Sequence, residues 1–159
     1  MSSTGARPTR TSWPRTLARL LLGAALLFTG TGHLTFGRQE FQAQVPSWVP
    51  VDADLVVLAS GVAELALGLG LLLLVRHRVL MGWLTAAFFV AIFPGNVAQY
   101  VEGRDAFGLE TDQGRLVRLF FQPVLVAWAL WSTGAWRAWR AGRRERVSAG
   151  ASATHRRGG

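Results

Sequence analysis

The chain has 159 residues, of which 50% are hydrophobic and 16% charged, and its formal net charge is +8. Soluble domains carry roughly 25% charged residues, so this composition indicates a membrane protein. The absence of cysteine excludes an internal disulfide, a thiol nucleophile and a CxxC motif, and a redox role would therefore need a bound cofactor or a partner. The sequence also lacks zinc-ligand spacings, an HExxH motif, a P-loop and a dinucleotide-binding GxGxxG motif, and no metal site is predicted.

The N-terminal segment is small, polar and basic, and it cannot bury enough apolar area to become ordered. Residues 1–12 are therefore expected to be disordered. The apolar run that follows comes after Arg15 and Arg19 and could be the h-region of a signal peptide. It is longer than such regions usually are, and three more apolar runs follow it. These features favour a first transmembrane helix over about residues 16–36.

Three further apolar runs, each bounded by charged residues, predict transmembrane helices over about residues 55–75, 79–101 and 117–137. Each is long enough to cross a bilayer as a helix, which takes about 20 residues. The connection after the second run is short, whereas the other two connections are longer and polar. The pattern predicts an all-α, integral membrane, up-down four-helix bundle within residues 13–139.

The distribution of arginine predicts the orientation of this bundle. All 17 basic residues are arginines, and most of them lie in the N-terminal segment, in the short second connection or after the fourth run. These three segments share one side of the predicted membrane. The positive-inside rule places that side, with both termini, in the cytoplasm. The prediction is a multi-pass protein of the plasma (inner) membrane.

The C-terminal tail, residues 140–159, is rich in glycine, alanine, serine and arginine, and its composition predicts disorder. Just before it, Trp136 and Trp139 alternate with arginines, a pattern that can stack on bases and neutralise phosphates. Interfacial anchoring of the tryptophans, with the arginines facing anionic lipid, explains the pattern better. No nucleic-acid partner is predicted.

Glu64 lies in the middle of the second apolar run, LVVLASGVAELALGLGLLLLV. A charged group at the centre of a bilayer costs about 2.5 to 3.5 kcal/mol on insertion scales. Packing does not require an acid at this position, so a functional or obligatorily paired role is predicted. In the same run Ala59, Ala63, Ala66 and Gly70 follow a helical spacing, which predicts the face that packs closely against another helix.

Further polar residues cluster toward the outer side of the predicted membrane. Helix rise places His33 about 7 Å and Glu64 about 15 Å below that surface. If the helices close as a bundle, one polar cavity open to the outside would form, and the cytoplasmic half supplies no comparable set. The candidate binding residues are His33, Glu64, Asn96, Gln99, Arg118 and Gln122, of which Glu64 and His33 are also the catalytic candidates.

Each of these residues except Glu64 has a simpler explanation when taken alone. His33 could be an interfacial histidine, and Asn96 and Gln99 could cap a helix that Pro94 interrupts. Gln122 could be an interhelical hydrogen-bonding residue, worth about 0.6 kcal/mol. The prediction of a site rests on their convergence with Glu64.

Five segments in order, TGTGHLTF, VPSWVP, SGVAELALGLGLLLL, FPGNVAQY and RLFFQPVLVAWALW, resemble the successive signatures of the DoxX-like family of small four-helix bacterial membrane proteins. The resemblance covers roughly residues 15–137. It implies a four-helix integral protein, in some members a subunit of a thiosulfate:quinone oxidoreductase and in others part of a thiol and radical detoxification assembly. The positions that it would carry over are His33, Glu64, Asn96 and Gln122.

Two classes of function remain open. In the first, the chain is a membrane subunit of a quinone-linked redox system, with other membrane or periplasmic redox subunits as partners. His33 and Gln122 would then bind the quinone carbonyls, and Glu64 would take or give the proton. In the second, the bundle is a non-catalytic scaffold, small-molecule binder or, less favoured, small-solute carrier, in which Glu64 pairs with His33 or Arg118 to hold the helices in register.

Overall fold

The structure, a computed structural model, describes residues 12–103 and 111–157. Its described part is all-helical and contains no strand. Seven helical elements follow one another: α1 (Trp13–Leu34), α2 (Arg38–Gln42), α3 (Ala53–Leu73), the 3₁₀ turn η1 (Val75–His77), α4 (Arg78–Val101), α5 (Asp112–Thr133) and α6 (Ala135–Arg157). Residues 1–11, for which disorder was predicted together with Ser12, lie outside the described residues. The middle of the connection before α5, residues 104–110, lies outside them as well.

Four helices are long and apolar enough to cross a membrane, which confirms this part of the prediction. They span Trp13–Leu34, Ala53–Leu73, Val75–Val101 and Leu116–Thr133, close to the expected ranges. The last span was expected to continue to residue 137, but α5 ends at Thr133. Gly134 follows with a φ of 78°, a left-handed conformation that glycine adopts without steric cost and that commonly ends a helix.

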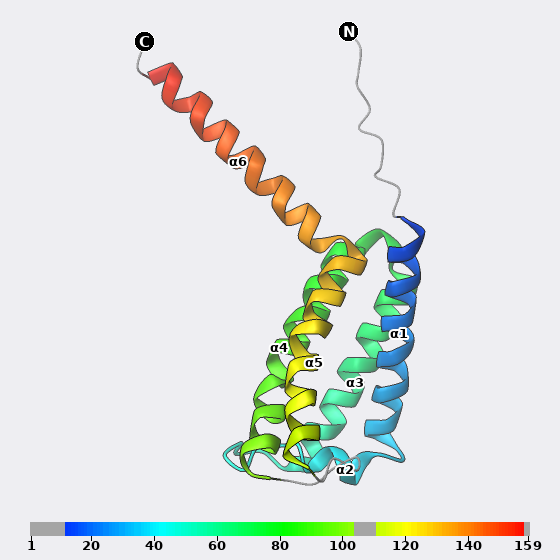
Figure 1. Ribbon diagram of the computed structural model, residues 1–159. Helices are drawn as coiled ribbons and strands as arrows, with labels where there is room; N and C mark the ends of the chain where they lie inside the picture. Colours follow the sequence, from blue (N-terminus) through cyan, green and yellow to red (C-terminus); the bar gives the residue numbers. More distant parts are fainter. Residues whose placement is uncertain (1–11, 104–110, 158–159) are drawn as a thin grey trace.

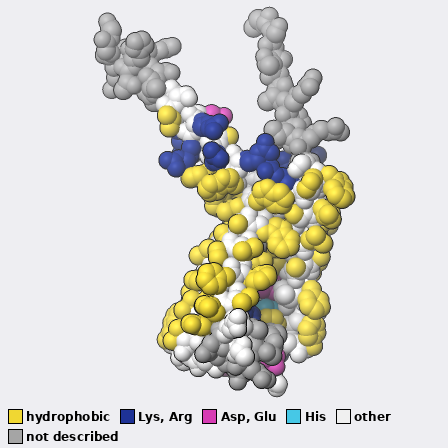
Figure 2. Space-filling view, in the orientation of Figure 1, with side chains coloured by type: hydrophobic (Ala, Val, Ile, Leu, Met, Phe, Trp, Pro, Cys, Tyr) yellow, Lys and Arg dark blue, Asp and Glu magenta, His cyan; other side chains and the backbone are white. Residues whose placement is uncertain are grey.

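The four long helices form two closely packed pairs, α1 with α3 and α4 with α5 (Figure 1). The short helix α2 lies at one end of the four helices, here named the α2 end, and α6 projects from the opposite end, the α6 end (Figure 1). Figure 2 shows hydrophobic side chains covering the surface of the long helices, with arginines gathered beside the start of α6. This distribution matches helices surrounded by lipid with charge at the membrane surface.

Four glycines let α1 and α3 approach closely. A Cβ on Gly23 would lie 3.1 Å from the carbonyl oxygen of Gly68, and one on Gly30 would lie 2.9 Å from that of Gly61. The glycines recur every seven residues on each helix, as expected for antiparallel neighbours that meet along one seam. The contact face predicted at Ala59, Ala63, Ala66 and Gly70 is wrong at Ala59 and Ala66, which are exposed, whereas Gly70 is buried against Met81 of α4.

The half of the helices toward the α6 end is filled by apolar side chains. Its buried core consists of Leu22, Leu26, Leu71, Met81, Ala86, Phe89 and Ala129. Arg19 is also buried here and donates a hydrogen bond to the carbonyl oxygen of Leu71. Leu22, Leu26 and Phe89 of this core also line the larger cavity, which extends from them toward the α2 end.

The C-terminal segment is helical through Arg157, although composition predicted disorder from residue 140. Alanine and arginine are strong helix formers, and the segment contains no proline. Its local propensity for helix therefore accounts for the difference without any need to bury apolar surface. Trp136 and Trp139 lie in the first turns of α6 with their rings 5.0 Å apart.

Candidate functional site

A cavity of about 1010 Å³ lies between the two helix pairs toward the α2 end. Side chains of α1, α3, α4 and α5 line it, together with the segment that connects α2 to α3. Most of the wall is apolar. Five of the six residues predicted from sequence lie on the wall: His33, Glu64, Asn96, Arg118 and Gln122. Gln99 is buried, at 1% exposure, but it is not part of the described wall.

Glu64 faces His33 across the α1–α3 seam. The distance from Glu64 Oε2 to His33 Nδ1 is 3.4 Å, and the two residues are only 5% and 9% exposed. The contact is possible because Gly30 and Gly61 lie beside it: a Cβ on Gly30 would lie 3.0 Å from Glu64 Cβ, and one on Gly61 2.8 Å from His33 Cβ. The glycine seam therefore positions the acid and the imidazole.

The hydrogen bond of His33 to its own helix shows which ring nitrogen carries the hydrogen. Nδ1 lies 2.9 Å from the carbonyl oxygen of Thr29, which can only accept, so Nδ1 carries the hydrogen. Oε2 of Glu64 is buried and has no hydrogen-bond partner, despite its proximity to Nδ1. A buried polar atom without a partner costs about 1 to 3 kcal/mol. A bound molecule that donates to Oε2 would remove this cost.

The short helix α2 holds an aromatic ring against His33. The ring of Phe41 stacks on the imidazole, with centroids 3.4 Å apart and an interplanar angle of 15°. Asp54, in the first turn of α3, fixes α2 in place by accepting hydrogen bonds from Arg38 and, at 2.8 Å, from Gln42 Nε2. The hydrogen bond with Asp54 raises the pKa of Arg38 above its ordinary value, so Arg38 stays charged in its contact with Asp54.

Asn96 and Gln122 join α4 to α5 on another wall of the cavity. Asn96 Nδ2 donates to Gln122 Oε1 at 2.9 Å, and Gln122 Nε2 donates to the carbonyl oxygen of Phe89 at 2.6 Å. Both side chains are buried. The carbonyl-binding role expected of Gln122 is therefore limited, because its oxygen and one of its donors serve the interhelical contact.

Arg118 contacts the connection after α2 rather than Glu64. Its Nη2 donates to Gln44 Oε1 at 2.9 Å, and the titratable side chain that faces Glu64 is His33. The backbone of Gln44 lies against α4 at Gly95, where a Cβ would be 2.7 Å from the Gln44 carbonyl oxygen. Gln44 Nε2 is buried without a hydrogen-bond partner.

Gln44 and Phe41 are therefore site residues that sequence reasoning missed. They lie just before the proline-flanked Trp48, in a segment that sequence alone describes only as a connection. The glycine of the FPGN segment was the one available signal, since it marks a position where another backbone can approach closely. No group of three or more histidine, aspartate or glutamate side chains that could hold a metal occurs among the described residues.

Comparison with known proteins identifies a family but no characterised relative. No curated protein and no solved structure matches the chain at a significant level. One family model matches residues 22–133, more than half of the chain, and it covers the seam glycines, the His33–Glu64 contact and the Asn96–Gln122 contact. The chain therefore belongs to the family described as Domain of unknown function (DUF8561).

Proposed function

We propose that this protein binds the head group of a lipid-soluble quinone in the cavity at the α2 end, as the membrane subunit of a quinone-linked redox system. The observation that carries the proposal is the buried Oε2 of Glu64, which lacks a hydrogen-bond donor and lies beside His33 on the wall of a cavity of about 1010 Å³. The resemblance to DoxX-like proteins agrees with this function and itself stays a prediction.

The proposed topology is an up-down four-helix bundle in the plasma (inner) membrane, with both termini in the cytoplasm. Arginines support it, because those near the start of α1, around η1 and along α6 lie toward the same end of the helices (Figure 2). In this orientation the cavity lies in the outer half of the bilayer. A ligand dissolved in the membrane could reach it without crossing the charged cytoplasmic surface.

The size and wall of the cavity suit a flat, mostly apolar molecule with two polar groups. Ligand pockets typically measure about 300 to 1,000 Å³ and combine apolar walls with a few placed polar groups. The aromatic side chains of Phe41, Phe88 and Phe121 line the wall, and Trp48 stands at its exposed edge.

Two of the three buried polar atoms that lack a hydrogen-bond partner in the described part of the chain match the two oxidation states of a quinone. Gln44 Nε2 is a buried donor without an acceptor and can donate to a quinone carbonyl. Glu64 Oε2 is a buried acceptor without a donor and can accept from a quinol hydroxyl. The donor role first assigned to Gln122 thus passes to Gln44, since Gln122 is engaged by Asn96 and Phe89.

Glu64 and His33 can each take a proton at the wall of the cavity. A quinone supplies two-electron, two-proton redox chemistry when bound. No described residue hydrogen-bonds to Nε2 of His33, while Nδ1 donates to the carbonyl oxygen of Thr29. The imidazole can therefore take a proton at Nε2. The electrons would come from partner redox subunits in the membrane or the periplasm.

Titration of the purified full-length protein with a short-chain benzoquinone tests the proposal. Glu64→Gln keeps the shape of the side chain but replaces a carboxyl oxygen by an amide nitrogen that cannot accept, and we expect about tenfold weaker binding, the equivalent of losing one hydrogen bond of about 1.4 kcal/mol. Glu145→Gln makes the same replacement at an exposed position on α6 and should leave binding unchanged. A wild-type protein that does not bind, or equal binding by the Glu64 variant, would contradict the proposal.

One observation favours the non-catalytic scaffold as the second candidate. The His33–Glu64 contact joins α1 to α3 beside their closest approach, where a structural pair would hold the two helices in register. In that case Glu64→Gln lowers the thermal stability of the protein in detergent and has no effect on ligand binding. Normal stability with lost binding would exclude this candidate.

A further inference from the structure

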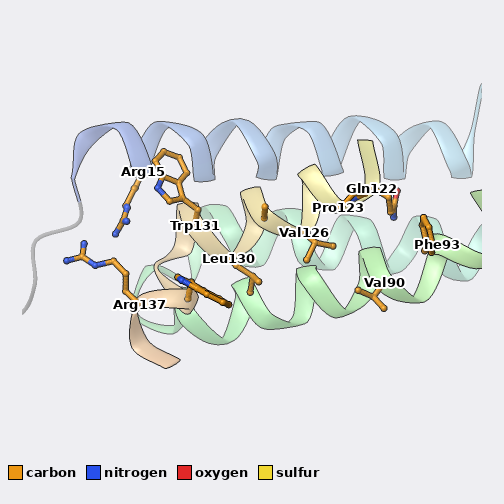
Figure 3. A pocket seen from close by; sticks show the side chains of 11 residues that line it. Arg15, Val90, Phe93, Gln122, Pro123, Val126, Leu130, Trp131 and Arg137 are labelled. Atoms are coloured by element: carbon orange, nitrogen blue, oxygen red, sulfur yellow. The ribbon is translucent and has the colours of Figure 1, made fainter. Parts of the chain in front are cut away.

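A second cavity, of about 660 Å³, lies on the outside of the α4–α5 pair toward the α6 end. We name it the lateral groove; Figure 3 shows its wall. Much of that wall faces outward: Val90 is 60% exposed, and Trp131 and Trp136 are each 47% exposed.

The polar and apolar parts of the lateral groove are separated along its length. Arg15 and Arg137 lie at one end, and the apolar wall runs from there along α5 to Gln122 (Figure 3). The stretch of α5 from Gln122 to Trp131 measures about 13 Å at a rise of about 1.5 Å per residue. The lateral groove is therefore elongated and apolar, with positive charge at the end where Arg15 and Arg137 lie.

The positive charge at this end of the lateral groove is not neutralised by the protein. The wall contains no acidic side chain among its described residues, and no ion pair to Arg15 or Arg137 occurs in the described part of the chain. The guanidinium of Arg15 lies over the ring of Trp131, 5.6 Å from its centroid, which leaves its donors at the edge of the groove. Two uncompensated arginines favour an anionic group between them.

We infer that the lateral groove binds an anionic phospholipid, whose phosphate contacts Arg15 and Arg137 and whose acyl chain lies along Val90, Val126 and Leu130. The separation of charge and apolar surface matches a lipid molecule, because Arg15 lies near the start of one candidate span and Arg137 just after another, and the apolar wall continues from them along α5 (Figure 3). A protein segment would have to bury these arginines. The inference does not depend on what occupies the cavity at the α2 end.

Native mass spectrometry of the full-length protein in detergent tests this site. The protein is titrated with phosphatidylglycerol or with phosphatidylcholine that carries the same acyl chains. We expect phosphatidylglycerol to bind more tightly than phosphatidylcholine. The double variant Arg15→Gln/Arg137→Gln should weaken phosphatidylglycerol binding about thirtyfold, because each arginine near an anionic lipid contributes about 1 kcal/mol. Arg140→Gln/Arg144→Gln removes the same charge from exposed positions on α6 and should change binding less than threefold or so.

A variant of the apolar wall distinguishes binding of the lipid in the lateral groove from general electrostatic attraction of the lipid to the protein surface. Val126→Trp fills the groove and leaves every arginine in place, so it should also weaken phosphatidylglycerol binding at least about tenfold. Arg137→Gln alone, in α6 and outside the four spans, gives a readout if the double variant does not fold, with about fivefold weaker binding expected. Equal binding of the two lipids, equal loss in both double-arginine variants, or unchanged binding by Val126→Trp would overturn the inference.

Discussion

Replacing Gly61 by valine is expected to lower the free energy of unfolding by about 2 to 3 kcal/mol, the upper range for overpacking a close contact. Even the first added carbon would lie 2.8 Å from His33 Cβ and 3.1 Å from the carbonyl oxygen of Gly30. Neither atom is the end of a flexible side chain, so α1 and α3 must separate. The change can be measured by unfolding of the purified protein in detergent.

Ala66→Val supplies a matched control, because it adds similar bulk to the same helix at an exposed position. It should change the free energy of unfolding by less than about 0.5 kcal/mol. Since the seam also positions Glu64 against His33, the Gly61 variant should lose ligand binding as well. Wild-type stability of the Gly61 variant would show that α1 and α3 do not meet along this seam.

Replacing Ala63 by phenylalanine is expected to weaken ligand binding about a hundredfold, the equivalent of about 2.7 kcal/mol of steric conflict. Ala63 lines the larger cavity next to Glu64, so an aromatic ring there occupies the volume that the ligand would need. The added side chain extends into empty space, and stability should therefore change little. Titration with a short-chain benzoquinone and thermal unfolding together measure both effects.

Ala66→Phe places the same ring on the exposed side of α3, away from the described wall of the cavity. It should bind the benzoquinone as the wild type does. Binding that survives in the Ala63 variant would mean that the ligand lies elsewhere, and equal losses in both variants would point to a general disturbance of the helix.

The four long helices and most of the candidate site follow from patterns that are local in the sequence. A run of about 20 apolar residues is a strong signal, and a glutamate within it is costly enough to be informative. Simple helix rise then places His33 and Glu64 at depths from which both can line one cavity. Five of the six predicted residues do lie on its wall.

The details that depend on which helix faces meet could not be derived from one sequence. Helical spacing allows either the face with Ala63 and Gly70 or the face with Gly61 and Gly68 to pack against α1. The contacts of Gly61 and Gly68 with α1 show that the second face does so. The same limit applies to Gln44, which contributes through its contact with Arg118, 74 positions later. Such contacts between distant segments leave no periodic signal.

The α6 half of the helices also holds buried polar side chains, although no set comparable to that of the cavity was expected there. Arg19 was assigned to the segment before the membrane, but it is buried and donates to the carbonyl oxygen of Leu71. Thr85, Ser132 and Thr133 are buried as well, and both Ser132 and Thr133 donate to the carbonyl oxygen of Ala129. A hydroxyl group that donates to a carbonyl oxygen of its own helix needs no polar side chain elsewhere in the chain. The sequence pattern therefore does not reveal that Ser132 and Thr133 are buried.

Mass spectrometry of the small molecules that co-purify with the intact protein tests the proposed function most directly. If the cavity at the α2 end holds a quinone against Glu64 and Gln44, the wild-type protein should carry a quinone at a substantial fraction of one per chain. The Glu64→Gln protein, purified in the same way, should carry about tenfold less. A wild-type protein without any quinone, or the same quinone content in both proteins, would contradict the proposal.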